Sequence, residues 1–333
     1  MTAIVRPANR EDLSRLEAMI AHVDPGMLTM PMTREAMLGR VERSLSAFGR
    51  GSEPPECEIY FLVLEEEGQL LGTASLITNL GVERPFYSYR IIRDSKVSPE
   101  TKTKVELDLL HLVNDHHGDT ELGTLFLMPG FRGGGRGRLL SFARLMLIAA
   151  DPVRFGRRAM AEIRGWTDEA GRSPFWEAVG AKFFRMDYRA ADSRSAADHR
   201  FIADLMPRYP IYVDLLPVDA RGVVGKPHKD AEPALAMLKS QGFKFNQVVD
   251  IFDAGPCVEA FTDQIDIVRS ARRMSAREFA GTDASESAMV ANGNVHKFAV
   301  TVAARDEARA DVAARLKAED ADELLVYQLK ERR

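Results

Sequence analysis

The sequence predicts an α/β (α+β) fold, in which a mixed twisted sheet is flanked by helices and followed by a second, smaller α/β part. Three patterns support this prediction. Apolar, strand-like runs alternate with amphipathic, helix-like runs along the chain. Residues 59–77 have the pattern of an antiparallel hairpin. An apolar run over 122–128 leads through a glycine-rich turn into a helical pattern over 139–150.

The N-terminal quarter predicts a strand, two helices and the hairpin. Ile4–Pro7 is a short strand, after which Asn9 or Arg10 opens a helix with one apolar face, formed by Leu13, Leu16, Met19 and Ile20. A second amphipathic helix is expected over 33–48, followed by a Gly/Pro-rich loop. The hairpin joins 59–64 to 70–77 through a charged turn at Gly68, and it suits the middle of a mixed sheet.

The next segments are expected to be an irregular aromatic stretch over 85–93 and a helix over 98–113, with Val105, Leu107, Leu109 and Leu110 inside. After the strand and helix around the glycine-rich turn, another strand is expected over 159–163. A helix over 173–179 then runs into Gly180, and an aromatic strand follows to Phe184.

Beyond residue 190 the alternation of helix and strand is looser. The expected elements are a helix over 196–206, an extended stretch over 207–213, helices over 217–223 and 231–241, a strand over 243–252, a polar linker over 270–287, and strands alternating with helix over 299–326. Two helix-Gly-aromatic passages, ending at Phe184 and Phe245, suggest a repeated α/β half. We therefore expect one domain over 1–190 and a second over 191–333.

Composition excludes several classes of function. The 333 residues, 45% hydrophobic and 28% charged, suffice for about two globular domains of ~100–200 residues each. A formal net charge of −4 gives no sign of a nucleic-acid or anionic-membrane partner. Cys57 and Cys257 are too few for a metal cluster. Without a signal-peptide pattern or a run of ~18 apolar residues, we expect a cytoplasmic protein with no membrane and no metal.

The glycine-rich turn has the composition of a phosphate cradle. Gly133, Gly135 and Gly137 allow a tight turn and a close backbone approach, and the following helix begins with unpaired N–H groups and a positive partial charge. Arg132, Arg136 and Arg138 add cations that suit phosphates, although at least one of them could be a solvated surface residue. A pyrophosphate fits such a site, whereas the Gly-Lys-Ser/Thr of an ATP-binding P-loop is absent. Two other interpretations remain: a turn whose glycines are purely steric, and an Arg-Gly nucleic-acid segment.

The spacing Arg132-x-x-Gly135-x-Gly137 resembles the acyl-CoA loop of GNAT-type N-acyltransferases. Longer motifs, in order from Arg6 to about Arg273, resemble the arginine N-succinyltransferase family. They are Asn114-Asp-His116, Glu121-Leu-x-Thr-Leu-Phe-Leu127, Gly165-x-x-Asp168-Glu169-x-Gly171-x-Ser-Pro-Phe-Trp176, Phe183-Phe184-x-Met-Asp187, Phe201-Ile-Ala-x-Leu-Met-Pro207-x-x-Pro-Ile-Tyr212, Val224-Gly225-x-x-His228 and Asp250-Ile-Phe-Asp-x-Gly-Pro256.

This resemblance implies a GNAT-like sheet, which the smaller C-terminal part would repeat. It also implies direct transfer of a succinyl group from succinyl-CoA, a co-substrate rather than a tightly bound cofactor, to the α-amine of L-arginine in arginine catabolism. By resemblance His228, on a loop of the C-terminal domain, is the proton donor, and Leu125 contacts succinyl-CoA. A homo-oligomer is implied at the level of the family.

The residue types suit these roles and also have simpler interpretations. Histidine transfers protons near neutral pH, although a loop histidine is more often solvated. Leu125 can be a core residue while its backbone pairs with the pantetheine arm. A polar cluster ahead of the CoA strand could line the amino-acid pocket or form a hydrogen-bonded loop; it comprises Asn114, Asp115, His116 and Glu121.

The chain departs from the family pattern at Ile91–Lys96 and at Gly123, both near the expected acceptor side. The acceptor is therefore less certain than the donor. Three alternatives stay open: another amine such as ornithine, another acyl-CoA, and a non-catalytic acyl-CoA-binding protein.

Overall fold

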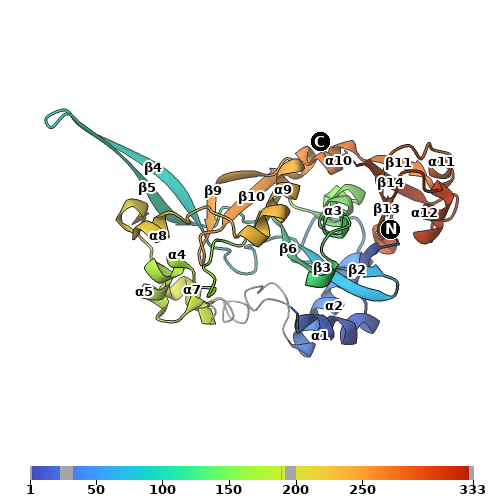
Figure 1. Ribbon diagram of the computed structural model, residues 1–333, viewed down its shortest axis with the longest axis horizontal. Coiled ribbons are helices and arrows are strands. Elements are labelled where there is room, and N and C mark those ends of the chain that lie inside the picture. Colours follow the sequence, from blue (N-terminus) through green and yellow to red (C-terminus); the bar gives the residue numbers. More distant parts are fainter. Residues whose placement is uncertain (1, 23–32, 189, 192–199, 330–333) are drawn as a thin grey trace.

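The computed structural model describes residues 2–22, 33–188, 190–191 and 200–329 (Figure 1). Their strands form a single mixed sheet across the molecule, in the order β11 (Arg272–Ser275), β14 (Glu323–Gln328), β12 (Ala288–Asn292), β13 (Val300–Ala303), β1 (Ile4–Pro7), β2 (Ile59–Glu66), β3 (Gln69–Ile77), β6 (Thr120–Leu127), β7 (Arg158–Glu162), β10 (Pro256–Phe261), β9 (Lys244–Asp250), β4 (Ser88–Ser98), β5 (Thr103–Val113) and β8 (Ile211–Tyr212). The predicted mixed sheet is confirmed.

The N-terminal elements form where their capping residues predict. Asn9 caps a 3-10 turn over Arg10–Asp12 that continues into α1 (Leu13–Ile20), and its side chain accepts the N–H groups of Glu11 and Asp12. Thr33 caps α2 (Arg34–Gly49). Both helices pack on one side of the β2–β3 hairpin, where their apolar residues bury against Phe61 and Val63.

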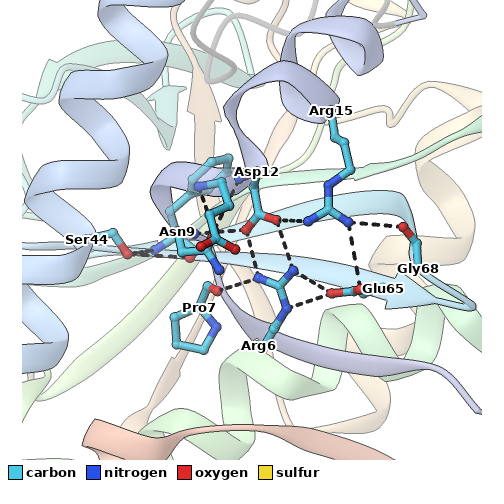
Figure 2. A network of polar contacts seen from close by, with 10 residues as sticks. Arg6, Pro7, Asn9, Asp12, Arg15, Ser44, Glu65 and Gly68 are labelled. Carbon is cyan, nitrogen blue, oxygen red and sulfur yellow. Dashed lines mark hydrogen bonds and ion pairs between the residues drawn. The ribbon is translucent and has the colours of Figure 1, made fainter.

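A buried carboxylate joins the first strand to the first helix. Asp12, with a fully buried side chain, accepts hydrogen bonds from Arg6 Nη1 at 2.7 Å and from Arg15 Nη2 at 2.6 Å (Figure 2). Arg6 also bonds Glu65 on β2. Burial alone would raise the pKa of Asp12, but the hydrogen bonds and charge of Arg6 outweigh it and lower that pKa.

Replacing Asp12 with Ala is expected to lower the free energy of unfolding by about 3 kcal/mol, because it leaves two guanidinium groups beside an emptied buried site. Chemical denaturation measures the change. The exposed ion pair between Arg10 and Glu42 provides the control, and Glu42→Ala is expected to leave the unfolding midpoint almost unchanged. Equal effects of the two substitutions would contradict the prediction.

The helix predicted over 98–113 is wrong: this segment is β5, the second strand of a hairpin with β4. Val105, Leu107 and Leu109 alternate with charged residues at a period of two, which a strand satisfies and a helix does not. The irregular stretch expected over 85–93 contains the start of β4. Pairing of β4 with β9 covers only Ser88–Arg90, so the hairpin projects far beyond the body of the molecule (Figure 1).

The aromatic strand predicted after Gly180 is also wrong. Gly180–Phe184 is a short helix, α5, directly after α4 (Pro174–Ala178). A Cβ on Gly180 would lie 2.1 Å from Cε3 of Trp176, so this glycine serves close packing between the two turns rather than a helix end. Because the passage ending at Phe245 does continue as a strand, β9, the two passages do not share secondary structure.

The polar linker predicted over 270–287 contains regular structure. It includes β11 and the helix α11 (Ala276–Ala280), which a capping box between Ser275 and Glu278 begins. Polar composition misled the prediction, since β11 is an edge strand with exposed arginines. A further short helix, α10 (Asp266–Ser270), was not predicted.

Most remaining predictions are confirmed, namely α3 (Arg136–Ala150), α7 (Arg200–Leu205), α8 (Val218–Arg221), α9 (Glu232–Ser240) and α12 (Arg309–Arg315). Residues 196–199 of the helix predicted over 196–206 lie outside the described residues. Strands from both sides of residue 190 share the sheet, and the division into domains at that point stays a prediction. In the described part of the chain no helix combines the length and apolar character that crossing a membrane requires.

Candidate functional site

The site begins where two parallel strands separate. β6 and β7 form the parallel pair in the sheet, and their pairing covers only Thr120 and Glu121 on β6. Opposite, β6 carries a bulge between Gly123 and Phe126, where its register with β3 shifts and Thr124 adopts a φ of 51°. Because the pairing with β7 ends at Glu121 and the bulge follows, the backbone of β6 around Leu125 has no pairing with β7 in the described part of the chain. A strand edge of this kind can pair with an amide-bearing ligand.

The glycine-rich turn lies at the end of the same strand. A 3-10 turn over Pro129–Phe131 follows β6, and three successive glycines then have positive φ, at 107° for Gly133, 58° for Gly134 and 81° for Gly135. Other residues adopt these values only with strain. Gly135 is the N-cap of α3, so the first N–H groups of a fifteen-residue helix face the turn.

Turn and strand line one cavity of about 1650 Å³. Its wall includes Leu125 and, from the turn, Arg132, Gly133, Gly134, Gly135, Gly137 and Arg138. Arg136 lies elsewhere, since its guanidinium bonds Glu66 with Nε 2.7 Å from Oε2. Of the three arginines predicted for phosphates, Arg132 and Arg138 thus line the cavity and Arg136 forms an ion pair.

His228 lies beside the cavity on a loop held against the end of β7. Its N–H donates to the carbonyl of Arg164, and Pro227 forms a bridge with Gly165. Its Nδ1 accepts the N–H of Asp230 at 3.2 Å, so the neutral ring carries its proton on Nε2. The side chain is 12% exposed, and the next three residues, 229–231, line the cavity.

Of the residues predicted for the acceptor, Glu121 lines the cavity. The other three have partners behind its wall. Asn114 accepts the N–H of Phe86, Asp115 pairs with Arg90, and buried His116 bonds Asp119 with Nδ1 3.1 Å from Oδ2. Because residues 83–87 line the cavity, Asn114 supports that wall rather than forming it.

The structure adds cavity residues that the sequence patterns did not single out. Arg40 on α2 and Arg144 on α3 stand on either side of the β6 bulge, where Arg40 bonds the Thr124 hydroxyl and Arg144 the Gly123 carbonyl. One signal for Arg144 was available: it is the single charged residue in the run 139–150, which is otherwise apolar except for Ser141.

Two carboxylates, from the last residue of β9 and from the turn between β9 and β10, form another part of the wall. Asp253 accepts the N–H groups of Gly165 and Gly255, and Asp250 accepts those of Phe252 and Asp253. These backbone donors are all uncharged. Burial and the neighbouring charge of Asp253 raise the pKa of Asp250 to about 8. A cation arriving here would therefore be stabilised by both carboxyl groups and would lower that pKa.

The raised pKa of Asp250 predicts a pH-dependent stability. A group whose pKa is higher in the folded chain than its unfolded value of about 3.9 contributes stability at low pH and loses it as pH rises through the folded value. Wild type is therefore expected to lose thermal stability between about pH 4 and 8 relative to Asp250→Asn, whose amide oxygen can still accept both N–H groups. The check is the melting temperature of wild type and of Asp250→Asn, measured at a series of pH values across this range. Two parallel curves of melting temperature against pH would contradict the prediction.

Comparisons with known proteins show which family the chain resembles. The profile of a family described as arginine N-succinyltransferase beta subunit matches residues 3–267. The chain is 36% identical over 301 residues to arginine N-succinyltransferase subunit beta of Pseudomonas aeruginosa, which covers 90% of this chain and 88% of that protein. Identity to arginine N-succinyltransferase of Escherichia coli O139:H28 is also 36%, over 309 residues, covering 92% and 90%.

A solved structure extends the match to the whole fold. It is described as arginine/ornithine succinyltransferase subunit AI from Pseudomonas aeruginosa, and it superposes on 99% of each chain with a TM-score of 0.88 and 27% identity. The resemblance recognised in the sequence motifs is thereby confirmed. Since the family profile spans most of the chain and the relatives cover about nine tenths of it, this chain belongs to the arginine N-succinyltransferase family of acyltransferases.

Proposed function

We propose that the protein transfers a succinyl group from succinyl-CoA to the α-amine of L-arginine by direct attack. The observation that supports this best is the single cavity that joins the edge of β6, the glycine turn at the start of α3, and the two carboxylates of Asp250 and Asp253. Donor and acceptor could meet there without a covalent enzyme intermediate. Burial raises the pKa of the Cys257 thiol well above its usual range, which makes it a poor nucleophile.

The donor would lie along β6. Its pyrophosphate suits the N–H groups of the glycine turn and Arg132, and its pantetheine amides suit the strand edge around Leu125. Gly137 leaves space at the start of α3, since a Cβ there would meet only the Leu127 side chain, at 3.9 Å. Arg136 would join the phosphate site only by exchanging its ion pair with Glu66.

Transfer requires two proton movements. The neutral α-amine attacks the thioester carbonyl carbon, and its nitrogen loses one proton to solvent as the C–N bond forms. The tetrahedral intermediate then collapses with cleavage of the C–S bond, and the departing CoA thiolate takes a proton. His228 is the proposed donor of that proton. Its ring would first take a proton from solvent on Nδ1, which lies 3.8 Å from Oδ2 of Asp230, and the resulting imidazolium would then give the Nε2 proton to the sulfur and return to the neutral ring.

The cationic side chain of the acceptor would lie against Asp250 and Asp253, whose oxygens accept uncharged N–H and O–H groups in the described structure. Glu121 stays in the proposal as a wall residue beside the bulge. Asn114 and His116 would act indirectly, by holding Phe86 in the segment that lines the cavity through a hydrogen bond to its N–H and a contact with its ring. Asp115 would hold Arg90 on β4.

We also propose that the protein assembles with another chain, either a second copy or a different subunit. Two of its relatives are named as subunits. The projecting β4–β5 hairpin supports the proposal, because it exposes Val97 and Val105 beyond the residues that pair with β8 and β9. Light scattering of the purified chain gives the mass of the assembly.

The first experiment measures free thiol released from succinyl-CoA with arginine, ornithine and lysine as separate acceptors, together with the mass of each product. Arginine-dependent release of succinylated arginine supports the proposal. If release depended on ornithine instead, ornithine would replace arginine as the proposed acceptor. If release from acetyl-CoA were faster, acetyl-CoA would replace succinyl-CoA as the proposed donor. If CoA bound but no thiol were released with any acceptor, the protein would be a non-catalytic acyl-CoA-binding protein rather than an enzyme.

A further inference from the structure

A buried guanidinium faces the cavity beside the β6 bulge. Arg144 is 1% exposed and lies eight residues into α3, roughly 12 Å along the helix from the glycine turn. Its hydrogen bonds go to the Ser141 carbonyl at 3.2 Å, the Ser141 hydroxyl at 3.0 Å and the Gly123 carbonyl at 3.4 Å. All three acceptors are uncharged, and no carboxylate of the described residues forms an ion pair with Arg144.

A buried cation without an ion-pair partner is costly. Burial lowers the pKa of Arg144 to about 9, and the charge of Glu121 only partly opposes this effect. Arg144 lines the same cavity as Leu125 and the glycine turn. A negatively charged group of a ligand bound in this cavity would offset the free-energy cost of burying the guanidinium charge.

A second guanidinium and a carboxylate lie near Arg144 among the described residues. Arg40 reaches the bulge from α2 and bonds the Thr124 hydroxyl at 3.1 Å. Glu121 is the nearby carboxylate; burial raises its pKa, whereas Arg40, Arg144, His116 and Arg84 all act to lower it. Glu121 therefore lies near Arg144 without forming an ion pair with it, and a carboxylate of the ligand would give Arg144 a paired charge.

We propose that Arg144, assisted by Arg40, binds the terminal carboxylate of the acyl group and so selects a dicarboxylic acyl-CoA over a simple one. This inference rests on the proposed donor. With the pyrophosphate at the glycine turn and the pantetheine along β6, the acyl group reaches Gly123 and Thr124, where both guanidinium groups donate hydrogen bonds. Charge-assisted bonds to a carboxylate then replace the contact of Arg144 with neutral oxygens.

The test compares succinyl-CoA with butyryl-CoA, in which a methyl group replaces the carboxylate. Wild type is expected to favour succinyl-CoA by about 10²-fold or more in both kcat/KM and binding affinity. Arg144→Met should lower the values for succinyl-CoA about 10²-fold and leave butyryl-CoA nearly unchanged. Arg40→Met should act in the same direction, and Arg144→Lys should keep part of the preference.

The matched control is Arg154→Met. Arg154 is also buried, but it bonds Asp151 and backbone carbonyls away from this cavity, so its loss should not change the ratio between the two donors. If Arg144→Met misfolded, kcat/KM and affinity would fall equally for both donors. In that case the variants Arg144→Lys and Arg40→Met provide the test. An unchanged donor ratio in the folded Arg144 and Arg40 variants overturns the proposal.

Two further measurements separate the alternatives. The first replaces arginine with argininamide, which lacks the acceptor's carboxylate. If the Arg144 variants changed the preference between these two acceptors rather than between the two donors, the assignment of Arg144 to the acyl group would be wrong. If wild type released no thiol but bound succinyl-CoA more tightly than butyryl-CoA in an Arg144-dependent manner, the carboxylate subsite would stand and the proposed transfer would fall.

Discussion

Replacing His228 with Ala is expected to lower kcat by about 10²–10⁴-fold while leaving the affinity for succinyl-CoA nearly unchanged. The reason is geometric: the side chain is held beside the cavity with Nε2 protonated, and the backbone N–H of residue 228 keeps its bond to the Arg164 carbonyl in the variant. Steady-state thiol release and equilibrium binding measure the two quantities separately.

The control must account for a second role of His228. Its Nδ1 accepts the Asp230 N–H and so begins the 3-10 turn over Lys229–Ala231, which lines the cavity. Asn is a good N-cap and has no proton to transfer near neutral pH, so His228→Asn should restore the turn but not the rate. Recovery of turnover in the Asn variant, or a folded Ala variant that keeps nearly the wild-type rate, would remove His228 from proton transfer.

Replacing Gly135 with Asp is expected to weaken CoA binding by roughly 10²-fold. Gly135 has a φ of 81° and caps α3, so a side chain there is strained and a carboxylate would occupy the position proposed for the pyrophosphate. Because Asp tolerates left-handed backbone better than most residues, the fold should survive. Calorimetric titration with CoA measures the loss.

Gly68 offers a matched comparison for this substitution. It has a φ of 77° in the β2–β3 turn, and a Cβ there would meet nothing within 4 Å. Gly68→Asp carries the same strain and charge away from the cavity and should bind CoA like wild type. Equal affinities for the two variants would exclude the glycine turn as the phosphate site.

The errors in the predicted fold share a cause. The segment over 98–113 contains both an alternating pattern and a pair of adjacent leucines, Leu109 and Leu110, so helix and strand competed, and pairing with β4 decided the outcome. At Gly180 the local pattern of a helix end was overridden by packing against Trp176. Local propensities are weak in such segments, and contacts distant in sequence determine them.

The residues of the candidate site fall into two groups, those that are contiguous in sequence and those that only the fold brings together. Gly133, Gly135 and the strand before them were visible because a phosphate cradle is local in sequence: turn and helix start are contiguous. The cavity wall is not local. Arg40 and Arg144 come from different helices, and Asp250 comes from the end of a strand more than a hundred residues further along the chain.

The sequence by itself determined the order of most helices and strands, the glycine turn, and through its motifs the family. Hydrophobic periodicity, capping residues and positive-φ glycines act over a few residues, so they can be predicted without coordinates. Only the tertiary structure decided that Arg136 pairs with Glu66, that Asn114 and Asp115 lie behind the cavity wall, and that Arg144 faces it. Burial and charge compensation arise between segments far apart in the chain, and the packing of the sheet alone brings those segments together.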